Sequence, residues 1–357
     1  MEDMLRRIGA AIAAVEKELG FDWRFSYWKL LPRERGAFEI EFSREEIWQR
    51  LPGHLDGFSV TGGKDSDRVA TLSAGGIGVG LKLLGADSTR PLLVVSSVAD
   101  VRREPSHSAE LLTQLIMGET AVSLKAEGDW FLVRLPDDYH GWIRSWYVRE
   151  TAGAEIEAYR RSARTVVEAS VGYVLSSRDA RSLPVCDVVA GTKIVADDAI
   201  EGFRAVTLPG GRRGFIREED VAPAIPPGQL DRERLAKRAM RFLGIPYLWG
   251  GATPKGFDCS GLVMRVFLAE GVSLPRDSDR QALVGVSLPA ERARDLSPGD
   301  LLFFGEEGKV GHVALSLGKA LFIHAYGEVK INSLSTEDER YDEKLAKKFL
   351  FARSVLR

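Results

Sequence analysis

The sequence predicts a multidomain protein: an N-terminal mixed α/β region, two small all-β barrels and a C-terminal α+β domain. Three observations support this fold class. A chain of 357 residues is too long for one ordinary hydrophobic core. Short β-prone segments form two similar sets, which end in Gly-Trp-Ile-Arg at 141–144 and in Gly-Phe-Ile-Arg at 214–217. A proline-rich linker at 223–228 then precedes alternating helix and strand patterns.

The first region, residues 1–90, begins with an amphipathic helix. Its apolar residues recur at helical spacing, at Leu5, Ile8, Ile12 and Val15. The stretch Ile8–Val15 looks briefly like a signal peptide, but Glu16 follows it at once and no small-residue cleavage site follows a longer apolar core. We therefore expect a cytoplasmic protein, or an exported one if the natural chain is longer at its N-terminus. The role of residues 1–90 is left open.

The two β-rich sets occupy barrel-sized segments, at 91–152 and 163–223. The strands that we predict in the first set are Pro91–Ser96, Thr120–Leu124, Trp130–Leu135 and Gly141–Ile143. Those in the second set are Val171–Leu175, Thr192–Val195, Phe203–Leu208 and Gly214–Ile216. Both sets resemble bacterial SH3-like domains, and this resemblance implies two small tandem barrels.

The last segment, residues 229–357, starts with a predicted helix at Leu230–Leu243. Asp231 lies near its start and Gly244 just beyond its end, as in many helices. Farther along, three segments predict successive strands of an antiparallel sheet, at Asp300–Phe304, Val313–Leu317 and Leu321–His324. This succession is typical of an α+β domain.

The composition argues against several classes of function. The formal net charge of −2 gives no reason to expect a nucleic-acid partner, and no apolar run is long enough to span a membrane. Two cysteines, Cys186 and Cys259, cannot form a disulfide framework, and neither belongs to a zinc-binding spacing. We therefore expect no metal or other cofactor and no membrane partner. The oligomeric state is left open.

Cys259 has the most informative surroundings in the chain. It follows Gly-Phe-Asp and precedes Ser-Gly and an apolar helical run, so it lies at or near the first turn of a helix. The positive end of a helix dipole lowers a thiol pKa, and free backbone N–H groups there stabilise an oxyanion. The alternative is a buried structural cysteine, the commoner fate of this residue type, but the polar neighbours argue against burial. We interpret Cys259 as a nucleophile with a lowered pKa.

A cysteine nucleophile needs a base, and two histidines follow at suitable positions. His312 opens one predicted strand and His324 ends the next, 12 residues later. If these strands pair as a hairpin, both side chains can lie together on one face. One histidine would then deprotonate Cys259 and the other would hold the first in the required tautomer. The alternative for each is a structural or solvated role. No comparable context surrounds His54, His107 or His140.

Residues 229–357 resemble the NlpC family of papain-like cysteine peptidases, which cleave peptides of bacterial peptidoglycan. Six stretches match in order: Tyr-x-Trp-Gly-Gly, Asp-Cys-Ser-Gly, Leu-Pro-Arg-Asp-Ser, Ser-Pro-Gly-Asp-Leu, Gly-His-Val and Phe-Ile-His-Ala. The resemblance implies a papain-like α+β fold in which Cys259 is the nucleophile and His312 the base. It also implies that His324 is the orienting third member and that Tyr247 places its hydroxyl near the thiol.

Within that family, the barrels and the stretches Gly-Ile-Pro-Tyr-Leu-Trp-Gly-Gly and Gly-Phe-Asp-Cys-Ser-Gly resemble the γ-D-glutamyl-L-diamino acid endopeptidases. This group includes the cytoplasmic dipeptidyl-peptidase VI type of murein-peptide recycling. The resemblance implies that a murein peptide with a free N-terminal L-Ala is cut after γ-D-Glu, which releases L-Ala-γ-D-Glu. It implies that Asp258 binds the substrate ammonium. Contacts to the dipeptide would come from Ser260 and Ser278, with Arg276 close by.

The same group implies a contribution from the first barrel to the end of the cleft. Glu119, in Met-Gly-Glu, and Tyr139, before His-Gly-Trp, occupy the matching stretches, although the loop before Tyr139 is shorter than usual. With Asp258 they would form a cage for an ammonium group and reject chains that continue past it. The alternative is that Glu119 is a solvated turn residue and Tyr139 a packing residue of the barrel.

Three other functions stay open at the level of sequence. The barrels could bind cell wall while the C-terminal domain is inert, although Cys259, His312 and His324 argue against this. The Cys-His pair could instead serve acyl transfer or amide cleavage on another substrate. The chain could also be an exported enzyme that remodels polymeric peptidoglycan. The sequence does not indicate which diamino acid follows the scissile bond.

Overall fold

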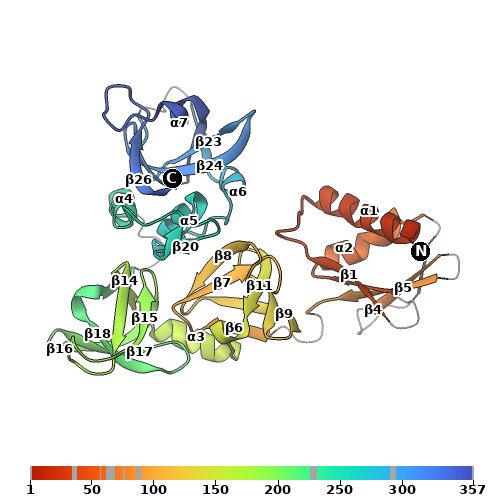
Figure 1. The fold of residues 1–357 in the computed structure, drawn as a ribbon, viewed down its shortest axis with the longest axis horizontal. Coiled ribbons are helices and arrows are strands. Elements are labelled where there is room, and N and C mark those ends of the chain that lie inside the picture. Colours follow the sequence, from red (N-terminus) through yellow and green to blue (C-terminus); the bar gives the residue numbers. More distant parts are fainter. Residues whose placement is uncertain are drawn as a thin grey trace. The chain divides into compact units, whose positions relative to one another are not determined.

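The computed structural model describes residues 2–33, 38–56, 58–61, 69–74, 77–85, 90–225, 231–289 and 295–355 (Figure 1). The chain divides into two compact units. The first comprises Met1–Leu92 and Thr120–Ser145, and the second comprises Leu93–Glu119 and Trp146–Arg357. Residues 226–228 of the predicted linker lie outside the described residues. The domain boundaries that the sequence suggests stay a prediction.

The N-terminal part of the first unit is a five-stranded sheet in the order β1-β2-β5-β4-β3, with β2 and β5 parallel and the other neighbours antiparallel. Helix α1 packs Ile8, Ile12 and Val15 into its core, as their spacing predicts. The predicted mixed α/β region is therefore confirmed. Its elements are α1 (Glu2–Leu19), β1 (Trp28–Pro32), β2 (Phe38–Phe42), α2 (Glu45–Arg50), β3 (Ser59–Thr61), β4 (Val69–Ala74) and β5 (Ile77–Leu83).

The first unit also contains an antiparallel meander of three strands. Its buried side chains Leu124, Trp130, Leu132 and Trp142 pack with Leu84 in one cluster. All three strands were predicted from the sequence, to within three residues at each end. They are β9 (Thr120–Glu127), β10 (Trp130–Arg134) and β11 (His140–Arg144).

The second unit contains the hairpin of β7 and β8 and, farther along the chain, a seven-stranded antiparallel sheet in the order β15-β14-β18-β17-β16-β13-β19. The four strands predicted in the second set are all present, and β14 matches its predicted ends. The β-rich character of both sets is confirmed. Strand β6 (Arg90–Val94) begins in the first unit and ends in the second, since the boundary follows Leu92. The other elements are β7 (Val98–Arg102), β8 (Leu111–Ile116), β12 (Val148–Glu150), α3 (Gly153–Ser162), β13 (Thr165–Val167), β14 (Val171–Leu175), β15 (Pro184–Val189), β16 (Lys193–Ile200), β17 (Phe203–Thr207), β18 (Arg213–Arg217) and β19 (Val221–Pro223).

The C-terminal part of the second unit is an α+β domain, as predicted. Its antiparallel sheet has the order β22-β27-β23-β24-β25-β26. Helix α5 packs against one face, and α7 contributes to the apolar cluster on the other face. The elements are α4 (Arg232–Met240), β20 (Ala252–Thr253), β21 (Gly256–Phe257), α5 (Cys259–Ala269), α6 (Ser278–Gln281), β22 (Val286–Leu288), β23 (Leu301–Glu306), β24 (Lys309–Gly318), β25 (Leu321–Tyr326), β26 (Glu328–Ser333), α7 (Glu343–Lys348) and β27 (Phe349–Ser354).

The start of α4 agrees with its sequence signal. The Asp231 side chain caps the helix and accepts hydrogen bonds from the backbone N–H groups of Glu233 and Arg234, at 2.8 and 3.1 Å. Gly244 follows the helix with φ of +80°, a conformation that favours glycine. The helix predicted at Leu230–Leu243 is therefore confirmed, with shorter ends.

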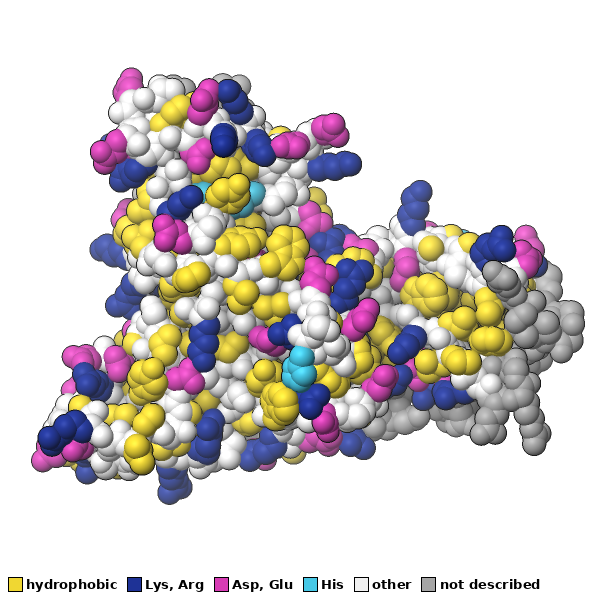
Figure 2. Space-filling view, viewed as in Figure 1, with side chains coloured by type: hydrophobic (Ala, Val, Ile, Leu, Met, Phe, Trp, Pro, Cys, Tyr) yellow, Lys and Arg dark blue, Asp and Glu magenta, His cyan; other side chains and the backbone are white. Residues whose placement is uncertain are grey.

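Charged side chains and helix hydropathy characterise the surface of the described residues. No helix within the described ranges is long and apolar enough to cross a membrane. On the face drawn in Figure 2, basic and acidic side chains are scattered among one another wherever residues are described. This pattern agrees with the small net charge of the chain.

Candidate active site

Cys259 is the first residue of α5, as the sequence predicts. Asp258 caps this helix and accepts a hydrogen bond from the backbone N–H of Gly261 at 2.7 Å. Gly261 has no room for a side chain, because a Cβ would collide with the carbonyl oxygen of Gly251. The Trp-Gly-Gly turn therefore packs directly on the first turn of α5 and holds the cysteine in place.

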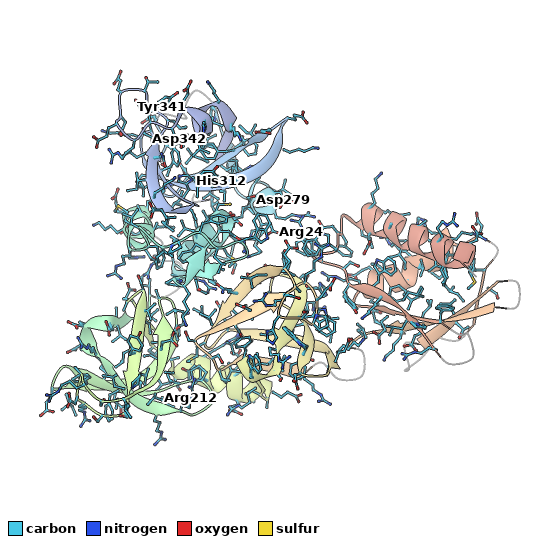
Figure 3. All side chains as sticks on the ribbon, viewed as in Figure 1. Arg24, Arg212, Asp279, His312, Tyr341 and Asp342 are labelled. Carbon is cyan, nitrogen blue, oxygen red and sulfur yellow. The ribbon has the colours of Figure 1, made fainter. Side chains whose placement is uncertain are left out.

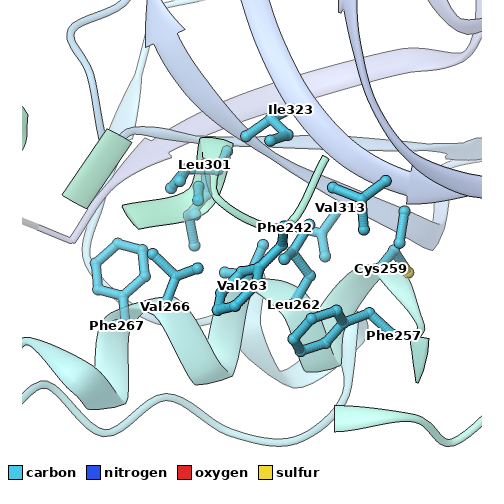
Figure 4. Close-up of a cluster of buried hydrophobic side chains, with 14 of the residues drawn as sticks. Phe242, Phe257, Cys259, Leu262, Val263, Val266, Phe267, Leu301, Val313 and Ile323 are labelled. Carbon is cyan, nitrogen blue, oxygen red and sulfur yellow. The ribbon is translucent and has the colours of Figure 1, made fainter. Parts of the chain in front are cut away.

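The thiol of Cys259 is buried, contrary to the expectation from its polar neighbours. Its exposed fraction is 8%, and it belongs to the apolar cluster between α5 and the sheet. Figure 4 shows it at one edge of this cluster, beside Val313. Val313 follows His312 on β24, so the fold brings the cysteine next to the strand that carries the predicted base.

Burial and the negative charge of Asp258 together raise the pKa of Cys259 to about 11. Hydrogen bonds with the backbone of Val313 and Ser260 and the positive charge of Arg276 oppose it. The prediction of a lowered thiol pKa was therefore wrong. It considered the helix terminus, which lowers the pKa, but not the burial of the thiol, which raises it more. In the free protein Cys259 is a neutral thiol at pH 7.

We expect this protonation state to be visible in a pH titration of thiolate absorbance. A group with a raised pKa keeps its proton below that value, so thiolate at Cys259 should form only as the pH approaches about 11. The measurement is the ultraviolet difference between wild type and Cys259→Ser, in which the contribution of Cys186 cancels. A difference already present at neutral pH would contradict the assignment.

His312 and His324 form a hydrogen-bonded pair, which confirms that they lie together on one face. His312 is on β24 and His324 on β25, and Nε2 of His312 lies 2.8 Å from Nδ1 of His324. His312 is labelled on the C-terminal sheet in Figure 3. This hydrogen bond uses Nε2 of His312 and leaves its Nδ1 atom outside the pair.

Both imidazoles are neutral near pH 7. Burial, together with electrostatic interactions with His324 and Lys330, lowers the pKa of His312 to about 3. Burial also lowers the pKa of His324 to about 4, although a hydrogen bond with Asn332 opposes the shift. A neutral imidazole beside a neutral thiol is suited to general-base catalysis, in which the proton moves as the sulfur attacks. The transfer from Cys259 to His312 remains a prediction.

Asp258 is paired with Arg276. The guanidinium donates to both carboxylate oxygens, at 3.1 and 2.6 Å, and also to the hydroxyl of Ser260 at 2.9 Å. Asp258 and Arg276 are both buried, with exposed fractions of 7% and 3%. The structure thus brings together three residues that the resemblance assigns to substrate binding. A substrate ammonium would have to share the Asp258 carboxylate with Arg276.

Tyr247 and Ser278 are the remaining residues predicted for the site in the catalytic domain. The charges of Cys259 and Asp258 add to the effect of burial and raise the pKa of Tyr247 to about 12, so its hydroxyl is protonated. Ser278 is the first residue of α6 and is partly buried. Gln281 in the same helix was not predicted, although its amide donates to the carbonyl oxygens of Ser260 and Pro275, at 3.0 and 2.8 Å.

Glu119 and Tyr139 both contact other residues of the protein. One carboxylate oxygen of Glu119 pairs with Arg265 at 2.5 Å, and the other accepts the backbone N–H of Ile116 at 2.9 Å. Tyr139 lies in the first compact unit, where its buried ring packs edge-on against Trp23 and Phe25. Their role in an ammonium cage stays a prediction, and these contacts are those of structural residues.

Strand β8 touches the active-site turn through residues that the sequence did not single out. The side-chain oxygen of Gln114 accepts from the backbone N–H of Ala252 at 3.2 Å and from the hydroxyl of Thr253 at 3.0 Å. The Trp249 indole donates to Glu110, which precedes β8, at 2.9 Å. The β7–β8 hairpin therefore supports the loop that precedes Cys259. Arg265, a charged residue inside the apolar run of α5, was a signal for such a contact.

The described parts of the chain contain no group of three or more His, Cys, Asp and Glu side chains placed to hold a metal ion.

Two family models match the chain. The NlpC/P60 family matches residues 244–347, which contain Cys259, His312 and His324, and the bacterial SH3 domain matches residues 97–149. Among curated proteins, dipeptidyl-peptidase 6 of Lysinibacillus sphaericus is 30% identical over 266 residues, covering 71% of this chain and 95% of that protein. Gamma-D-glutamyl-L-lysine dipeptidyl-peptidase of Bacillus subtilis is 29% identical over 243 residues, covering 65% of this chain and 78% of that protein.

A solved structure supports the fold. The crystal structure of an NlpC/P60 family protein from Bacillus cereus matches with a TM-score of 0.63 at 22% identity, covering 75% of this chain and 100% of that one. The matched region is long enough to include SH3-like and catalytic parts together. The fold class predicted from the sequence is confirmed.

Proposed function

This chain belongs to the NlpC/P60 family of cysteine peptidases, and we propose that it hydrolyses the amide bond between γ-D-Glu and the following diamino acid in peptides derived from peptidoglycan. The observation that carries this proposal is the placement of Cys259 at the start of α5, beside the strand of a hydrogen-bonded His312–His324 pair. The names of two similar proteins, dipeptidyl-peptidase 6 and gamma-D-glutamyl-L-lysine dipeptidyl-peptidase, support the choice of bond.

In the proposed reaction, Sγ of Cys259 attacks the γ-carbonyl carbon of D-Glu while its proton passes to Nδ1 of His312. The bond from this carbon to the nitrogen of the diamino acid then breaks, and the nitrogen leaves with the proton from His312. Water hydrolyses the thioester, with its proton passing through His312 back to Sγ. The carboxyl group of D-Glu is released and the thiol is restored.

During the attack, negative charge develops on the carbonyl oxygen of the substrate, and the N-terminus of α5 can stabilise it. The first backbone N–H groups of a helix have no acceptor within it, and they point toward the end that Cys259 occupies. Such fixed donors stabilise an oxyanion better than they stabilise the neutral carbonyl group. The neutral hydroxyl of Tyr247 is a further donor in the neighbourhood of the thiol.

We further propose that the substrate is a murein peptide with a free N-terminal L-Ala, and that the product is L-Ala-γ-D-Glu. The carboxylate of Asp258, directly before the nucleophile, supports this because a carboxylate is the natural partner of an ammonium group.

As the setting of this activity we propose peptide recycling in the cytoplasm. The apolar stretch Ile8–Val15, which looks like part of a signal peptide in the sequence, packs into the core of the first unit instead. Fractionation of the native host, with the chain found in the soluble cell extract, would support this location. Recovery from the culture medium or cell wall would contradict it.

Kinetics on two forms of one peptide test the specificity. We expect kcat/KM for L-Ala-γ-D-Glu-diamino acid with a free amine to exceed that of the N-acetylated peptide at least about a hundredfold, because acetylation removes the charge that Asp258 would bind. Equal rates would contradict recycling of free peptides and favour the exported enzyme that remodels polymeric wall. Hydrolysis of neither form would contradict the proposed substrate.

A further inference from the structure

Asn332 extends the histidine pair by one residue. It lies on β26, opposite Phe322, while its neighbour Lys330 lies opposite His324. Residues two apart on paired strands share one face, so Asn332 is the diagonal neighbour of His324. The side-chain oxygen of Asn332 lies 2.9 Å from Nε2 of His324. The sheet therefore aligns His312, His324 and Asn332 in one hydrogen-bonded chain.

A hydrogen bond to the backbone of Arg340 fixes the orientation of the Asn332 amide. Its nitrogen donates to the carbonyl oxygen of Arg340 at 3.3 Å, which leaves its oxygen toward His324. The same Arg340 carbonyl accepts the backbone N–H of Ser333 at 2.9 Å. The Arg340 side chain is paired with Asp338 at 2.9 Å. The loop after β26 thus holds the amide with its acceptor facing the imidazole.

This orientation determines where the protons sit. An amide oxygen can only accept, so Nε2 of His324 must carry the hydrogen. A neutral imidazole has a single N–H, so Nδ1 of His324 is an acceptor and receives the N–H of His312 Nε2 at 2.8 Å. His312 Nδ1 is then unprotonated. The Asn332 oxygen therefore fixes the tautomer of His324, and His324 in turn fixes the tautomer of His312.

We propose that Asn332 is a positioning residue that selects, through His324, the tautomer in which Nδ1 of His312 is free to take the proton of Cys259. It does not touch the reacting atoms. Its consequence for hydrolysis rests on the proposed peptidase function, whereas its effect on the two imidazoles does not.

The test is the tautomeric state of the histidines, read from long-range proton–nitrogen correlations of the full chain labelled with ¹⁵N-histidine. In wild type at neutral pH we expect both His312 and His324 to carry hydrogen on Nε2 alone. In Asn332→Leu, which removes the acceptor at similar volume, we expect signals of the Nδ1–H tautomer at both histidines. Asn332→Asp keeps an acceptor and should keep the wild-type tautomers.

The same variants are assayed for hydrolysis. We expect Asn332→Leu to lower kcat about tenfold, the value of one buried hydrogen bond, with little change in KM, and Asn332→Asp to retain most of kcat. Hydrogen on Nδ1 of His324 in the wild type would overturn the proposal even if no variant folds. So would Asn332→Leu with unchanged tautomers and kcat. Expected tautomers in a protein that cleaves no murein peptide would refute the proposed function and leave the positioning role intact.

Discussion

Replacing Cys259 by alanine is expected to lower kcat/KM for the free murein peptide at least about ten-thousandfold, because no other group can form the thioester. The side chain lost is small and lies at the edge of the apolar cluster. Helix α5 should therefore keep its packing and remain capped by Asp258. The assay is release of L-Ala-γ-D-Glu, and far-ultraviolet circular dichroism checks that the fold is retained.

The chain supplies its own matched control for this variant. Cys186 is the other free cysteine and lies on β15, in the second seven-stranded sheet. Cys186→Ala should leave kcat/KM within about twofold of wild type, because this residue packs in the apolar cluster of the second seven-stranded sheet and not in the cluster that contains Cys259. Activity retained by Cys259→Ala, or lost equally in both variants, would show that Cys259 is not the nucleophile.

The second large effect concerns the buried pair of Asp258 and Arg276. Arg276→Met should lower the free energy of unfolding by about 3–5 kcal/mol, because it leaves a buried carboxylate without its charged partner. The geometry supports a loss of this size, since the guanidinium contacts both oxygens of Asp258 and the hydroxyl of Thr113. Urea unfolding of the full chain, followed by circular dichroism, gives the measurement.

Two comparisons separate the buried charge from a general cost of substitution. Arg217→Met breaks the exposed pair with Glu219 and should cost less than about 1 kcal/mol. The double variant Asp258→Asn with Arg276→Met should recover part of the loss, because asparagine caps a helix as well as aspartate and carries no charge. A loss at Arg276 no larger than at Arg217 would contradict the role of this ion pair.

Much of the C-terminal domain could be predicted because its signals are local. Asp231 and Gly244 mark helix ends by chemistry that depends on neighbouring residues. His312 and His324 were placed together because adjacent strands joined by a short turn form a hairpin. The same reasoning located β14 from Val171 to Leu175. Helix α3 was missed, because its polar residues carry one buried side chain, that of Ile156, and no apolar stripe.

The features that the sequence did not predict depend on residues far apart in the chain or on burial. Arg265 pairs with Glu119, 146 residues away, and Arg276 bonds to Thr113, 163 residues away. The raised pKa of Cys259 comes from its place in the apolar cluster, which no local motif specifies. Asn332 reaches His324 through the register of β25 and β26, which requires the folded sheet.

The most direct test of the account is the identity of the products from one defined peptide, L-Ala-γ-D-Glu-L-diamino acid with a free amine. Mass spectrometry after incubation with the wild-type chain should show L-Ala-γ-D-Glu and the free diamino acid, and neither product with Cys259→Ala. Cleavage at another bond, the same products from Cys259→Ala, or intact peptide after incubation with the folded wild-type chain would contradict it.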